Sequence, residues 1–67
     1  MDPPKKYLTE RQVAEITGFS QYTFQRLRYE HRGPAYLKIG RSVRYRLEDI
    51  QRWMESRRIV VEPDRNL

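Results

Sequence analysis

The start and stop signals of two short, adjacent helices constrain the fold of this chain more than any other feature of its sequence. Thr9 precedes Glu10-Arg11-Gln12. This Thr-x-x-Gln spacing predicts a capping box, because the threonine hydroxyl can accept a backbone N–H of the first turn while the glutamine reaches back. Gly18 supplies the left-handed backbone that commonly ends a helix. A first helix of about two turns is therefore expected, and its inward face comprises Val13, Ile16 and Thr17.

A second helix is expected to begin almost at once. Ser20 is placed to cap it, and the helix is predicted to run from Gln21 to about His31, before Gly33-Pro34 ends it. Two capped helices that meet across three residues are typical of a helix-turn-helix, whose second helix enters the major groove of DNA.

The second predicted helix has one apolar and one polar face. Phe24 and Leu27 point inward, with Ser20 and His31 beside them. The opposite face carries Tyr22, Gln25, Arg26 and Tyr29, flanked by Gln21 and Thr23. Gln and Arg can pair with purine edges, Thr can contact bases or a thymine methyl, and Tyr can reach phosphates. This face suits base readout; the alternative is an ordinary solvated helix.

Residues 33–46, GPAYLKIGRSVRYR, predict a two-stranded hairpin. Residues 36–39 and 43–46 alternate in polarity around Gly40-Arg41-Ser42, which fits a glycine-containing loop of about 3 to 5 residues. Alternation assigns Leu37, Ile39, Val43, Tyr45 and Leu47 to the core side, and Tyr36, Lys38, Arg44 and Arg46 to the other side. A basic hairpin beside a helix suggests a DNA-binding wing. The alternative is an edge hairpin whose charges discourage aggregation.

The residues after the hairpin predict a third helix. Glu48 and Asp49 favour a helix N-terminus, and Arg57-Arg58 suits the negative end of the helix dipole. One face of this helix comprises Ile50, Trp53, Met54 and Arg57. Trp53 is expected to make the largest apolar contribution to the core. The apolar run Ile59-Val60-Val61 can either cover the core or stay available to a protein partner or a second copy.

Positive charge is concentrated in one segment. Residues 25–46 hold seven of the 14 Lys and Arg residues and a single acid, Glu30, whereas the rest of the chain carries seven bases and eight acids. The formal net charge of +5 therefore arises in this segment. Such a distribution indicates a polyanionic partner, and nucleic acid is the leading candidate.

The length of 67 residues limits the chain to one domain with a small core. The lack of cysteine excludes a disulfide framework and cysteine-based zinc sites, and fits an intracellular protein. No apolar run approaches the roughly 18 to 20 residues that cross a bilayer, so a cytoplasmic protein is expected. The folded domain is expected at residues 7–61, between flexible segments at 1–6 and 62–67.

The sequence offers no residues for catalysis. His31 is the only histidine, and the adjacent acids Glu48 and Asp49 point about 100 degrees apart on a helix, so they form neither a dyad nor a metal pair. A glycine-rich phosphate loop and a nucleophile with a spaced base are both lacking. We expect no enzyme activity, no metal and no cofactor.

The chain resembles the excisionase and AlpA-like family over about residues 7–57. The resemblance rests on Leu8-Thr9, Val13-Ala14, residues 20–26, Gly33-Pro34, residues 38–41, residues 43–46, Asp49-Ile50 and Trp53. It implies a mostly helical α+β fold, a small winged helix-turn-helix related to the DNA-binding domain of MerR-like regulators, with three short helices and a two-stranded wing. Phe24 stands where many relatives carry Leu.

The resemblance implies double-stranded DNA as the partner, with the second helix in the major groove and the hairpin on backbone or minor groove. The implied contacts of the second helix are Ser20, Gln21, Tyr22, Thr23, Gln25, Arg26 and Arg28. Those of the wing are Lys38, Arg41, Ser42, Arg44 and Arg46.

Small members of this family are often recombination directionality factors of bacteria or phages. They bind repeated sites cooperatively beside an attachment site, bend the DNA and direct an integrase toward excision. The resemblance equally fits an AlpA-like transcription regulator of a prophage or integrated element. A third interpretation is a small adaptor that holds a protein partner through residues 59–67.

Overall fold

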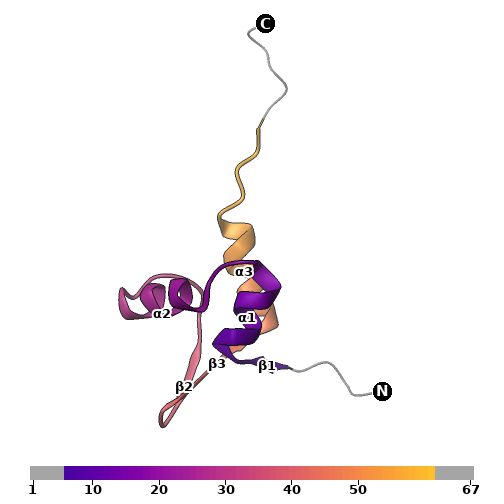
Figure 1. Cartoon of the computed structure of the whole chain (residues 1–67). Helices are drawn as coiled ribbons and strands as arrows, with labels where there is room; N and C mark the ends of the chain where they lie inside the picture. Colours follow the sequence, from indigo (N-terminus) through magenta and orange to yellow (C-terminus); the bar gives the residue numbers. More distant parts are fainter. Residues whose placement is uncertain (1–5, 62–67) are drawn as a thin grey trace, which may run out of the picture.

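The computed structural model describes residues 6–61 of the chain. Three helices and three strands follow one another along it (Figure 1): β1 (Tyr7–Leu8), α1 (Glu10–Thr17), α2 (Gln21–Tyr29), β2 (Leu37–Ile39), β3 (Ser42–Arg46) and α3 (Leu47–Ser56). The flexibility predicted for residues 1–5 and 62–67 lies outside the described residues. Among the described residues, no helix combines the length and apolar character that crossing a membrane requires.

The predicted capping of the first two helices is confirmed. The Gln12 amide donates to Thr9 Oγ1 at 3.1 Å, and the Thr9 amide donates to Gln12 Oε1 at 2.9 Å, which completes the capping box. Gly18 ends α1 with a φ of 83°. Ser20 caps α2 by accepting the Thr23 amide at 3.1 Å. The helix-turn-helix geometry therefore follows from local capping.

The second helix is shorter than predicted. It ends at Tyr29, and Glu30 is its C-cap. His31 follows with a positive φ of 58°, so the chain leaves the helical path before Gly33 and Pro34. His31 and Ser20, expected beside the core, are both exposed.

The three strands form one antiparallel sheet in the order β1-β3-β2. Ile39 pairs with Ser42, so the hairpin turn contains only Gly40 and Arg41, and Gly40 has a φ of 60°. The predicted loop was therefore too long. Paired residues share a face, and the observed pairs set Leu37 against Arg44 and Lys38 against Val43.

The predicted faces are right for β3, where Tyr45 is buried and Val43 packs against the core, but wrong for β2. The shorter turn places Val43 and Tyr45 on the same face as Lys38, whereas Leu37 and Ile39 share the opposite face with Arg44. Ile39 is 68% exposed, although alternation assigned it to the core. Basic side chains therefore occur on both faces of this hairpin.

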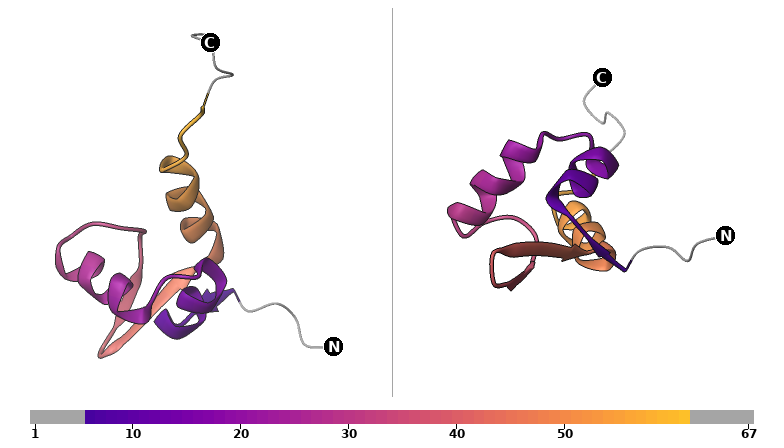
Figure 2. Two further views of the ribbon diagram at one scale, coloured as in Figure 1. Left: turned by 45° about the horizontal axis from the view of Figure 1, so that its top comes forward. Right: turned by 60° about the horizontal axis from the view of Figure 1, so that its bottom comes forward.

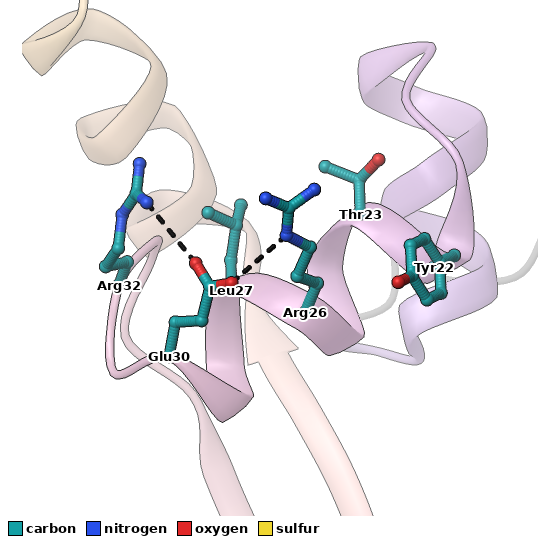
Figure 3. Close-up of a pocket in the computed structure, with 6 residues that line it drawn as sticks. All are labelled: Tyr22, Thr23, Arg26, Leu27, Glu30 and Arg32. Carbon is teal, nitrogen blue, oxygen red and sulfur yellow. Dashed lines mark hydrogen bonds and ion pairs between the residues drawn. The ribbon is translucent and has the colours of Figure 1, made fainter.

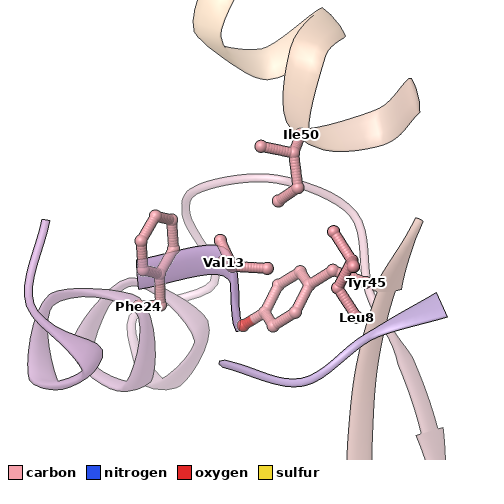
Figure 4. Close-up of a cluster of buried hydrophobic side chains, with 5 residues drawn as sticks. All are labelled: Leu8, Val13, Phe24, Tyr45 and Ile50. Carbon is pink, nitrogen blue, oxygen red and sulfur yellow. The ribbon is translucent and has the colours of Figure 1, made fainter. Parts of the chain in front are cut away.

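The core brings together one or two residues from most elements (Figure 4). Its buried side chains are Leu8, Val13, Phe24, Tyr45 and Ile50, with Leu27, Val43 and Trp53 packed against them. Phe24 lies at its centre, because its ring makes edge contacts with the rings of Tyr45 at 6.2 Å and Trp53 at 6.0 Å between centroids. Tyr45 and Phe24, rather than the half-buried Trp53, are the largest fully buried residues.

Three further residues assigned to the core are exposed. Ile16 on α1 is 56% exposed, Leu47 37% and Met54 39%. The short helices and the narrow sheet cannot cover every apolar position in a domain of this size. The run from Ile59 to Val61 is also exposed, at 83%, 69% and 85% for its three residues, and does not cover the core.

The arrangement places two elements on one side of the molecule. In Figures 1 and 2, α2 and the turn between β2 and β3 project to the same side, while residues 57–61 extend away from the end of α3. The second helix of the helix-turn-helix and the hairpin turn thus share one side of the molecule.

Candidate nucleic-acid interface

The predicted outer face of α2 is exposed in the structure. Most of the predicted residues are exposed, namely Ser20, Gln21, Tyr22, Gln25, Arg26 and Tyr29. Tyr22 is 67% exposed and Tyr29 87%, so both rings are open to solvent. The Thr23 hydroxyl lies 2.9 Å from the Ser20 hydroxyl, so the cap also orients Thr23. This face offers amide, guanidinium, hydroxyl and aromatic groups along one helix.

Arg26 and Arg32 share one carboxylate at the end of α2 (Figure 3). Arg26 Nε donates to Glu30 Oε2 at 3.1 Å, and Arg32 Nη1 donates to Glu30 Oε1 at 3.3 Å. These side chains, with Tyr22, Thr23 and Leu27, line a shallow hollow of about 250 Å³. The hollow is too small and too open for a substrate pocket.

Arg28 lies on the inner side of α2, where it braces three elements. Its Nε and Nη2 donate to the two oxygens of Glu10 at 2.9 and 3.3 Å, and the Tyr45 hydroxyl donates to the same carboxylate at 2.9 Å. The guanidinium also lies over the Tyr36 ring, 5.8 Å from its centroid. Its side chain is only 25% exposed. The resemblance implies that Arg28 contacts DNA, but in this structure its Nε and Nη2 groups donate hydrogen bonds to Glu10.

This brace shifts two pKa values. The hydrogen bond to Glu10 raises the pKa of Arg28. Burial raises the pKa of Tyr45 well above its ordinary value of 10, and the hydrogen bond that the hydroxyl donates to Glu10 adds to the shift. The brace therefore holds a charged arginine and a neutral tyrosine, which fixes α1 and α2 against the hairpin.

The wing residues fall into two groups. Lys38, Arg41 and Ser42 are exposed around the turn. Arg44 and Arg46 are half-buried nearer the core: Arg44 Nη1 donates to the Val43 carbonyl at 2.8 Å, and Arg46 forms an ion pair with Glu48. Lys38 and Arg41 are thus the exposed cations of the predicted wing.

Sequence reasoning missed Glu10, Glu30 and Arg32. The spacing of Glu30 four residues after Arg26 is a local signal that could have identified their pair. Glu10 and Arg28 are 18 residues apart, so only the folded chain shows their contact. Among residues 6–61, no group of three or more potential metal ligands exists.

A helix-turn-helix followed by a basic hairpin and a packed third helix defines a small winged helix-turn-helix protein. The chain belongs to the helix-turn-helix domain family, whose family model matches residues 7–58. That family includes excisionase and AlpA-like DNA-binding proteins, and its domains are typically non-enzymatic. Membership supports sequence-specific binding of double-stranded DNA. A search of curated proteins finds no match to the chain.

Proposed function

We propose that α2 binds in the major groove while the turn of the hairpin contacts the neighbouring backbone or minor groove. The observation that carries this proposal is that α2 and the basic turn project to a common side (Figure 2), and that α2 carries a row of exposed polar and aromatic residues. A helix of this size fits the major groove, and the flanking cations suit phosphates.

The proposed contacts divide by chemistry. Gln25 and Arg26 read base edges, and Tyr22 and Tyr29 contact bases or phosphates. Lys38 and Arg41 contact phosphates. Additional proposed contacts are Ser20, Gln21, Thr23, Arg28, Ser42, Arg44 and Arg46. Arg28 is already paired with Glu10 and Arg46 with Glu48, so each of these arginines would have to divide its N–H donors between that carboxylate and DNA.

We further propose that the output of this binding is that of an excisionase. A single module of this kind buries roughly 600 to 1,000 Å² of its surface on DNA, so useful affinity needs several copies on repeated sites. Bending a site costs about 1 to 6 kcal/mol, which additional contacts between copies offset. The partners of this function are duplex DNA, neighbouring copies and an integrase. The exposed run from Ile59 to Val61 is a surface available for protein contacts.

An excision assay tests this output. An attachment site with its flanking DNA is incubated with the cognate integrase, with and without the protein, and a footprint locates the bound sites. Excision that depends on the protein, with protection of repeated sites, supports the proposal. Unchanged excision together with altered output of a nearby promoter would instead establish an AlpA-like transcription regulator.

A gel shift on duplex DNA tests the shared premise. DNA binding must weaken as salt rises, in proportion to the phosphates that the protein neutralises. Absence of binding even at low salt would leave the adaptor interpretation, in which residues 59–67 hold a protein partner.

A further inference from the structure

The position of Glu30 poses a question about the proposed DNA-binding surface. Glu30 is the single acid among residues 25–46, which contain seven bases. A carboxylate beside DNA is repelled by phosphates and lowers the affinity for every sequence. An ion pair this exposed adds little stability, since its arginine side chain is 62% exposed and its glutamate 35%. The small contribution of this ion pair to the stability of the fold is therefore a weak reason for an acid at position 30.

The hydrogen-bond geometry suggests another reason. Glu30 Oε2 accepts specifically from Nε of Arg26, at 3.1 Å. Among the described residues 6–61, the two terminal nitrogens of Arg26 have no hydrogen-bond partner, and Figure 3 shows them on the side of the guanidinium away from Glu30. Those terminal nitrogens can form the paired hydrogen bonds of arginine with guanine O6 and N7. The contact with Glu30 thus restrains the arginine and leaves the base-reading donors open.

The other oxygen of Glu30 is also occupied. Oε1 accepts from Arg32 Nη1 at 3.3 Å, so the Glu30 carboxylate pairs with both Arg26 on α2 and Arg32 in the loop that follows α2. The hydrogen bond that Arg26 donates to Glu30 raises the pKa of Arg26, in line with a charged and oriented guanidinium. Without this carboxylate, both long side chains are free to turn toward phosphates, which occur at every sequence.

We propose that Glu30 is a positioning residue that determines sequence selectivity. By holding Nε of Arg26, and by engaging Arg32, it lowers binding to DNA in general and directs Arg26 to a base pair. This inference rests on the proposed placement of α2 in the major groove. It concerns selectivity and not the existence of DNA binding.

The test compares Glu30→Gln with Glu15→Gln. Glu15 forms an exposed ion pair with Arg11 at 3.8 Å, also four residues apart on a helix, but on α1. Both variants raise the net charge by one, so both are expected to bind all duplexes more tightly through phosphates. Affinities for the footprinted site and for a scrambled duplex are measured at several salt concentrations. The ratio of the two affinities is the readout.

Glu30→Gln is expected to lower this ratio by about fivefold to tenfold, a loss within the range that one paired arginine contact supplies. Glu15→Gln should leave the ratio unchanged. Glu30→Asp retains the charge but is too short to maintain the contact with Nε, so it should lose selectivity like Glu30→Gln. A ratio that stays constant in Glu30→Gln, or a normal ratio in Glu30→Asp, overturns the positioning role. Thermal melts identify any variant that has lost its fold.

Arg26→Ala separates this inference from its premise. If Arg26→Ala relaxes selectivity while Glu30→Gln does not, α2 reads DNA and the inference about Glu30 is wrong. If neither variant affects the ratio, the placement of Arg26 at the bases is wrong as well.

Discussion

At the scale of single residues, arginines with the same charge hold three different positions. Arg28 is enclosed by Glu10 and the Tyr36 ring, Arg26 is restrained at one nitrogen by Glu30, and Arg41 is exposed at the hairpin turn. Enclosure serves the fold, partial restraint suits base readout, and exposure suits phosphate contact. The surroundings of each guanidinium therefore suggest its role better than the residue type does.

The contrast between Arg26 and Arg41 leads to a first prediction. Arg26→Ala should cost about 1 to 3 kcal/mol on the specific site and much less on scrambled DNA, because the proposed base contact would be lost. Arg41→Ala should weaken binding to both duplexes alike. Titrations of each variant against both duplexes measure these effects. Equal losses on specific and scrambled DNA for both variants would contradict the division.

Tyr45 supplies a second prediction, at alkaline pH. Because burial raises its pKa above 10 in the folded protein, the unfolded chain loses this proton first as pH rises. The contribution of the neutral phenol to stability is complete below pH 10, and it declines as pH rises from 10 toward the folded pKa. We therefore expect the free energy of unfolding to fall above pH 10.

Tyr45→Phe should remove this part of the alkaline decline. At neutral pH it should cost about 1 kcal/mol, because Glu10 loses one hydrogen-bond donor. Urea denaturation at several pH values between 8 and 11 measures both effects. Tyr29→Phe is the control, since Tyr29 is 87% exposed and has a similar environment in both states. An undiminished alkaline decline in Tyr45→Phe would show that another group causes it.

At the scale of elements, the hairpin depends on a two-residue turn. Gly40 has a φ of 60°, and a Cβ added there would meet no atom within 4 Å. The effect of a substitution should therefore come from the backbone alone. A valine in the left-handed region is strained by about 1 to 2 kcal/mol, whereas asparagine tolerates that region.

We accordingly expect Gly40→Val to destabilise the hairpin and Gly40→Asn to preserve most of its stability. Hydrogen exchange of the amides of β2 and β3 measures this effect, and affinity for scrambled DNA should fall with it, since the turn positions Arg41. The amides of α1 should remain protected in both variants. Equal protection of β2 and β3 in the two variants would show that the turn tolerates either residue.

Elements set by neighbouring residues could be predicted from the sequence, whereas contacts between distant residues could not. Thr9 and Ser20 predict the starts of their helices correctly, because a helix cap involves only residues three positions apart. The faces predicted for β2 were wrong, because one residue fewer in the loop reverses which residues of the two strands share a face. The bond from Arg28 to Glu10 spans 18 residues and has no local signal.

At the scale of the whole molecule, the net positive charge is confined to one part of the chain. The net charge of +5 arises within residues 25–46, which contain α2 and the hairpin. Arg57 and Arg58 carry as much charge as Lys38 and Arg41, and all four residues are exposed. They differ in place: residues 57 and 58 lie at the far end of α3, away from the side on which α2 and the turn project (Figure 1).

Two charge-matched double variants test this arrangement. Lys38→Gln with Arg41→Gln, and Arg57→Gln with Arg58→Gln, each lower the net charge from +5 to +3. Each phosphate contact contributes about −0.9 to the slope of log K against log salt concentration, so loss of the two wing cations should make the slope less negative by about 2. The α3 variant should retain the original slope. Equal changes in the two variants would mean that overall charge attracts DNA, and that the wing has no particular place on the backbone.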